Sequence, residues 1–119
     1  MKIVITAQGA TPDSPLDTRF GRASNFLIYD DATGTWESVS NEQNMQALQG
    51  AGVQAATTVA NTGGKVLISG HCGPKAFRTL RAAEIDVYSS SAATAEQALK
   101  AFQRGELVKL NDADVEAHW

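Results

Sequence analysis

Residues 68–79 contain the side chains with the clearest capacity for chemistry. The stretch ISGHCGPKAFRT holds Cys72, the only cysteine of the chain, directly after His71, one of two histidines. A thiol beside an imidazole can be an inert core residue, a nucleophile or a soft metal ligand. These three interpretations lead to three different functions.

The first interpretation is structural. Free cysteine is among the most buried residue types, and a small side chain packs readily at a turn from strand to helix. Cys72 is then unreactive, and His71 is a solvated loop residue.

The second interpretation is a cysteine-dependent phosphatase or an enzyme similar to arsenate reductase. Cys72 and Arg78 are separated by five residues, so H-C-x5-R outlines a loop in which amides and an arginine hold a phosphate. Two features fit this outline poorly. Pro74 lacks one of the amide hydrogens that such a loop uses, and only Asp13 and Asp17 are placed to act as a general acid.

The third interpretation is a soft ligand set. Thiolate and imidazole suit molybdenum, iron and copper sulfides, but Cys72 and His71 alone do not complete a protein-built site. A preformed anionic cluster can still be held by shape and charge. The candidates for a positive lining are two arginines and the residues at a helix start: Arg19, Arg22, Gly73 and Lys75.

Hydrophobic periodicity and turn residues predict an alternating α/β chain. The predicted strands are residues 2–7, 26–30, 35–39, 66–69 and 85–88, and the second and third form a hairpin around a DATG turn. The predicted helices are residues 50–61, one that begins at Pro74, and one capped by Thr94 and ended by Gly105.

This element order predicts a five-stranded mixed sheet in the order 3-2-1-4-5 with helices on both faces, because strands joined through helices run parallel. The carboxyl ends of the first, fourth and fifth strands then lead into residues 8–17, 70–73 and 89–92 at one edge of the sheet. Ligands of open α/β sheets bind at that edge. The topology therefore places Cys72 where a site is expected.

Length and charge narrow the class of protein. We expect one domain over residues 1–110 and a disordered acidic tail over residues 111–119, which includes His118. The formal net charge of −3 provides no basic field for nucleic acid, and no stretch is apolar enough to span a membrane. A single cysteine suits a reducing compartment, so we expect a cytoplasmic protein. Residues 40–49, with Met45, are expected to form a mobile loop.

Three short motifs resemble one known family. MKIVITAQG, then DTRFGRASNFLIYD, then the glycine, proline and phenylalanine pattern around GPKAF are similar to the dinitrogenase iron-molybdenum cofactor family. The resemblance covers about residues 1–110. That family includes nitrogenase cofactor carrier and maturation proteins and the small orange protein, which carries a molybdenum–copper sulfide cluster. Its fold is ribonuclease H-like, which agrees with the order 3-2-1-4-5.

The resemblance implies a noncovalent carrier, not an enzyme. It would bind, store or transfer an anionic cluster of molybdenum with iron or copper, with cofactor-assembly proteins as partners. The implied cluster-binding residues are Arg19, Arg22, Gly70, Gly73 and Lys75, with Cys72 and His71 as soft metal contacts. The cysteine-dependent enzyme and a ligand-free scaffold in cofactor assembly remain the alternatives.

Overall fold

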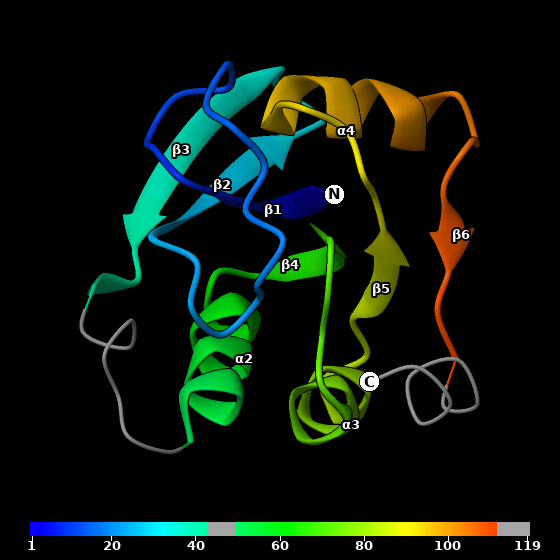
Figure 1. Cartoon of the computed structure of the whole chain (residues 1–119). Helices are drawn as coiled ribbons and strands as arrows, with labels where there is room; N and C mark the ends of the chain where they lie inside the picture. Colours follow the sequence, from blue (N-terminus) through cyan, green and yellow to red (C-terminus); the bar gives the residue numbers. More distant parts are fainter. Residues whose placement is uncertain (43–49, 112–119) are drawn as a thin grey trace.

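The structure, a computed structural model, describes residues 1–42 and 50–111 of the chain. Its centre is a six-stranded mixed sheet in the order β3-β2-β1-β4-β5-β6 (Figure 1). The strands are β1 (Lys2–Ala7), β2 (Asn25–Asp30), β3 (Thr35–Ser40), β4 (Gly64–Ser69), β5 (Asp86–Ser89) and β6 (Val108–Lys109). Strands β1, β4 and β5 are parallel, whereas β2, β3 and β6 pair antiparallel with their neighbours.

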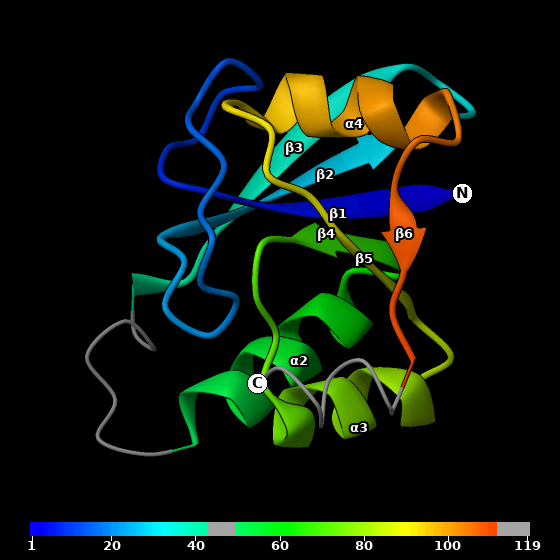
Figure 2. The same ribbon diagram turned by 45° about the vertical axis from the view of Figure 1, so that its right-hand side comes forward.

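Alternation along β1 divides its side chains between two cores. Val4 packs in the cluster beneath α2 (Ala51–Asn61) and α3 (Pro74–Ala82), whereas Ile3 and Ile5 pack beneath α4 (Ala95–Gln103). This division follows from the opposite directions of successive side chains in a strand. The prediction of helices on both faces is confirmed, with α2 and α3 on one face and α4 on the other (Figure 2).

Glycine and threonine mark the boundaries of α2 and α4, and for α4 the residues are the predicted Thr94 and Gly105. Gly63 and Gly105 follow α2 and α4 with φ of 82° and 72°, in the left-handed region that glycine adopts without a steric penalty. The Thr94 hydroxyl accepts a hydrogen bond of 3.2 Å from the amide of Gln97 and so caps α4.

The sheet contains one strand more than the sequence predicts. The first five strands have the predicted ribonuclease H-like order, and β6 adds an edge by pairing antiparallel with β5. The amide of Leu110 also donates to the carbonyl of Val87 at 2.8 Å. A strand of two residues is too short for hydrophobic alternation to reveal it.

The carboxyl ends of the parallel strands meet at one edge, as the topology requires. The amide of Asp17 donates to the carbonyl of Thr6 at 3.0 Å, and that of Ser90 donates to the carbonyl of Ser69 at 3.0 Å. The loops after β1, β4 and β5 are therefore fastened to the strand ends. Within the described ranges, no helix is long and apolar enough to cross a lipid bilayer.

Candidate functional site

A hollow of about 480 Å³ opens at this edge, between two loops and the starts of two helices. One side is the turn that precedes β2, and the other is the loop between β4 and α3. The floor and the remaining wall come from the first turns of α2 and α3. The lining residues are Arg19, Phe20, Gly21, Arg22, Gly50, Ala51, Gly52, Val53, His71, Gly73, Pro74, Lys75 and Ala76.

The turn over residues 18–23 is fastened to the loop after β4. Arg19 and His71 form an isolated parallel bridge, and the amide of Phe20 donates to the carbonyl of His71 at 3.1 Å. The Phe20 side chain is buried in the core, where its ring centroid lies 5.8 Å from that of Phe26. The two predicted motifs thus share one wall of the hollow.

The same turn also touches the start of α2. A Cβ at Gly21 would lie 2.9 Å from the amide nitrogen of Gly52 and 3.0 Å from its Cα, closer than backbone atoms tolerate. Glycine at position 21 therefore permits the contact between turn and helix.

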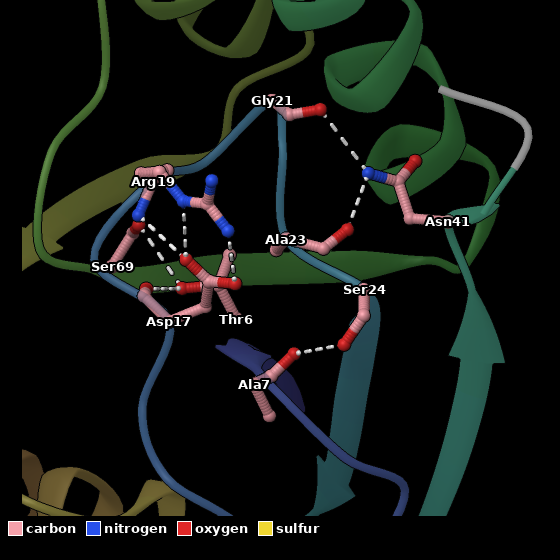
Figure 3. A network of polar contacts seen from close by, with 9 residues as sticks. All are labelled: Thr6, Ala7, Asp17, Arg19, Gly21, Ala23, Ser24, Asn41 and Ser69. Carbon is pink, nitrogen blue, oxygen red and sulfur yellow. Dashed lines mark hydrogen bonds and ion pairs between the residues drawn. The ribbon is translucent and has the colours of Figure 1, made fainter. Parts of the chain in front are cut away.

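Asn41 holds the turn from behind. Its side-chain amide donates to the carbonyls of Ala23 at 2.8 Å and Gly21 at 3.3 Å (Figure 3). The residue is fully buried. The Ser24 hydroxyl donates to the carbonyl of Ala7 at 3.1 Å and ties the turn to the end of β1. The turn is therefore positioned by β1, by the end of β3 and by the loop after β4.

Arg19 is anchored by a buried carboxylate. Asp17 accepts from the Arg19 amide at 3.0 Å and from its Nε at 3.3 Å (Figure 3). The Asp17 side chain is 3% exposed and that of Arg19 is 63% exposed. The Thr6 hydroxyl bonds to the Asp17 carbonyl at 2.6 Å and lies 3.1 Å from the Ser69 hydroxyl. The guanidinium is therefore held at the shared wall, with part of its charge offset by Asp17.

Two helices begin at the hollow without a side-chain cap. Gly50 precedes α2 and Gly73 precedes α3; neither offers a side-chain acceptor, and neither helix has an acidic residue in its first turn. By contrast, α4 has the Thr94 cap and Glu96 in its first turn. First-turn amides and the helix dipole favour an anion where no side chain serves as cap.

Among the residues that the structure describes, the charged side chains of the hollow are all basic. Arg19, Arg22 and Lys75 line it together with His71, and no described aspartate or glutamate does. Apolar groups such as Phe20, Pro74 and Ala76 complete the wall. The arrangement suits an anionic ligand with a weakly hydrated surface.

A family model described as dinitrogenase iron-molybdenum cofactor matches residues 1–105. The chain belongs to this family. The resemblance indicated by the sequence motifs is therefore confirmed.

Two solved structures and one sequence relative agree with this assignment. The apo form of the orange protein from Desulfovibrio gigas is 39% identical, with a TM-score of 0.88 and 92% of each chain covered. A provisionally named NifB protein from Thermotoga is 33% identical, with a TM-score of 0.82 and 92% of each chain covered. An uncharacterized protein of Methanocaldococcus jannaschii is 29% identical over 79% of this chain and 81% of its own length.

Of the seven residues that the family resemblance implicates, five line the hollow: Arg19, Arg22, His71, Gly73 and Lys75. Gly70 lies beside it and has a structural role, since a Cβ there would sit 2.8 Å from the Cα of Thr18. Gly73 differs, because its φ of −68° suits any residue and a Cβ would meet nothing within 4 Å. Glycine at position 73 thus leaves open space next to the first amides of α3.

Cys72 points away from the hollow. Its side chain belongs to the core cluster beneath α2 and α3, the residue is 1% exposed, and burial raises the pKa of its thiol to about 12. This is the position expected from the first interpretation, in which Cys72 is an unreactive core residue. The expectation that Cys72 is a soft metal contact finds no support in this position.

The outline of a cysteine phosphatase is not assembled either. A nucleophilic cysteine needs an accessible thiolate, and burial holds Cys72 in the thiol form at neutral pH. Arg78 is exposed on α3 and is not part of the lining of the hollow. Pro74 occupies the first helical position, where its missing amide hydrogen costs the helix nothing.

Sequence patterns missed two parts of the site. The start of α2, residues 50–53, could have been recognised, because its sequence Gly-Ala-Gly begins a helix without a capping residue. Asn41 could not have been recognised, because a lone asparagine after a strand is common in loops. In the loop predicted over residues 40–49, Ser40 ends β3 and Asn41 is buried, whereas residues 43–49, with Met45, lie outside the described residues. His118 of the tail also lies outside them.

Proposed function

We propose that this protein binds a preformed, anionic metal–sulfur cluster containing molybdenum in the hollow between the 18–23 turn and the starts of α2 and α3. It stores the cluster or transfers it to cofactor-assembly proteins, without turnover chemistry of its own. Membership of the iron-molybdenum cofactor family and the likeness to the orange protein support this class of role.

The observation that carries the proposal is the convergence of positive charge. Two uncapped helix starts meet three cationic side chains in a hollow that no carboxylate of the described residues lines. Each helix terminus contributes roughly half an elementary charge through its unpaired amides. An anion placed there replaces the missing cap of both helices at once.

The type of ligand follows from what the protein does not supply. In the part of the chain that the structure describes, no group of three or more histidine, cysteine, aspartate or glutamate residues could hold a metal ion. A metal that arrives with its own ligands needs no such group. Inorganic sulfide is a soft ligand for molybdenum, copper and iron, and its polarisable surface suits the apolar parts of the wall. His71 is the soft side chain that remains at the rim.

Reconstitution tests the proposal. The protein is incubated with tetrathiomolybdate and copper or iron, and the retained cluster is measured after desalting by its visible charge-transfer bands and by metal analysis. Wild-type protein is expected to retain a coloured species.

Two variants at Gly73 sharpen the test. Gly73→Asp provides the missing cap of α3 and places a carboxylate in the hollow, so it should raise stability by about 1 kcal/mol while abolishing retention. Gly73→Asn is the matched control, because it caps the helix equally well without the charge. Retention should fall less in Gly73→Asn than in Gly73→Asp.

Other outcomes would assign another function. Full retention of the cluster by Gly73→Asp would show that the cluster does not bind in this hollow. Hydrolysis of an aryl phosphate that disappears in Cys72→Ser would support the cysteine-dependent enzyme. If neither a coloured species nor hydrolysis is found, a ligand-free scaffold remains, and a partner pull-down would then identify its client.

A further inference from the structure

A second hollow lies on the other side of the Arg19–His71 wall. It has a volume of about 630 Å³ and is lined by Thr18, Arg19, Gly70, His71, Ser89, Ser90, Ser91 and Val108. It sits at the carboxyl ends of β4 and β5, next to the short β6. Arg19 and His71 are the residues that it shares with the first hollow.

Hydroxyl groups dominate this second hollow. Thr18 and Ser91 are exposed, and among the described residues neither hydroxyl has a hydrogen-bond partner. Ser90 is only 8% exposed; its hydroxyl accepts from the amide of Ala92 at 3.1 Å, which leaves its own proton to donate. The Ser89 hydroxyl reaches the carbonyl of Gly70 at 3.4 Å.

The backbone that carries the hydroxyls is held in place. The amide of Ser90 donates to the carbonyl of Ser69 at 3.0 Å, so the serine loop is fastened to the end of β4. Thr18 is packed against Gly70, where a Cβ would be 2.8 Å from the Cα of Thr18. The two loops that carry the donors are therefore both packed against the residues at the end of β4.

One cationic side chain, that of Arg19, belongs to this hollow. Arg19 lies on its wall with its Nε and one terminal nitrogen directed at Asp17, and the guanidinium has further N–H groups to offer. In the described part of the chain, no aspartate or glutamate lines it. An arginine fork beside several hydroxyl donors is the donor set that tetrahedral oxyanions require.

We propose that this second hollow binds a tetrahedral oxyanion group, either a free anion such as molybdate or phosphate or the phosphate of a nucleotide. Its chemistry differs from that of the first hollow: oxygen anions are strongly hydrated and need hydrogen-bond donors, which Thr18, Ser90 and Ser91 provide. The volume exceeds the needs of a single small anion, so both sources fit. The proposal does not depend on cluster binding in the first hollow.

Calorimetric titration of the cluster-free protein tests the site. The probes are inorganic phosphate, molybdate and AMP, with adenosine as a control that lacks the phosphate. We expect saturable binding of phosphate-bearing or oxyanion probes and none of adenosine. Binding of AMP alone would identify a nucleotide phosphate as the source, and binding of molybdate and phosphate would identify a free anion.

Variants locate the binding. Thr18→Val removes the hydroxyl but keeps the branched shape that packs against Gly70, and Ser91→Ala removes an exposed hydroxyl. Each should weaken binding by roughly three- to tenfold, the loss of one hydrogen bond. Ser38→Ala on the far edge of the sheet is the matched control and should change nothing.

Two results would overturn the proposal. One is the absence of saturable binding for every oxyanion probe. The other is binding that falls in Lys75→Gln but is unchanged in Thr18→Val and Ser91→Ala, because the anion would then occupy the first hollow. Since the titration uses protein without cluster, its failure leaves the reconstitution experiment unaffected, and the reverse also holds.

Discussion

At the scale of a single residue, the buried thiol of Cys72 makes the stability of the fold decrease as the pH rises through the alkaline range. Burial raises its pKa from 9.0 to about 12, so the folded state keeps the proton in a range where the unfolded state loses it. The contribution of the protonated thiol to the free energy of unfolding is complete below pH 9 and falls as the pH rises toward 12. Each pH unit in that interval costs about 1.4 kcal/mol.

The measurement compares wild type with Cys72→Ala, because tyrosine and lysine titration is common to both proteins. Between pH 7.5 and pH 10.5, urea unfolding should show wild type losing about 2 kcal/mol more than the variant. Cluster retention at neutral pH should be equal in the two proteins. Equal losses of stability would mean that the fold accepts the thiolate, which would restore Cys72 as a ligand or nucleophile.

At the scale of the elements, the hollow exists because the 18–23 turn rests on the start of α2. In Gly21→Ala the new methyl group would lie 2.9 Å from a backbone nitrogen of Gly52, so turn and helix must separate. We expect a loss of about 1–3 kcal/mol in stability, together with weaker cluster retention.

Gly73→Ala is the matched control for this prediction. It adds the same methyl group at the same hollow, but into open space and at an ordinary φ. Alanine caps a helix less well than glycine, but it also makes the unfolded chain stiffer, and the two effects offset one another. The free energy of unfolding, measured by thermal unfolding, should therefore change by less than about 0.5 kcal/mol. Similar losses in both variants would show that the Gly21 contact does not determine the position of the turn.

The elements were largely predictable from the sequence, whereas the contacts between them were not. Strand and helix types follow from local periodicity and from residues such as Thr94 and Gly63, and crossover rules then fix the sheet order. The direction of the Cys72 side chain depends on the path of the loop between β4 and α3. The burial of Asn41 depends on its hydrogen bond to Ala23, 18 residues earlier in the chain. Such long-range geometry leaves no periodic trace in the sequence.

At the scale of the whole molecule, an anionic ligand meets a protein with a formal net charge of −3. Long-range attraction cannot come from the net charge, so it must arise from the local group of Arg19, Arg22 and Lys75. Exposed charges act over about 10 Å at 0.1 M salt and about 3 Å at 1 M. The influence of this local group is therefore strongest in dilute salt.

Arg22→Glu tests this local field. Reversing one charge of the hollow should weaken cluster binding by roughly tenfold at 20 mM salt, and the ratio to wild type should shrink severalfold at 0.5 M. Arg104→Glu makes the same change in net charge just beyond α4, on the other face of the sheet, where Arg104 forms an exposed pair with Glu106. This control should bind nearly as wild type at both salt concentrations. An equal loss for Arg22→Glu at low and high salt would show that Arg22 supports the turn instead of attracting the cluster, because packing, unlike an exposed charge, is not screened by ions.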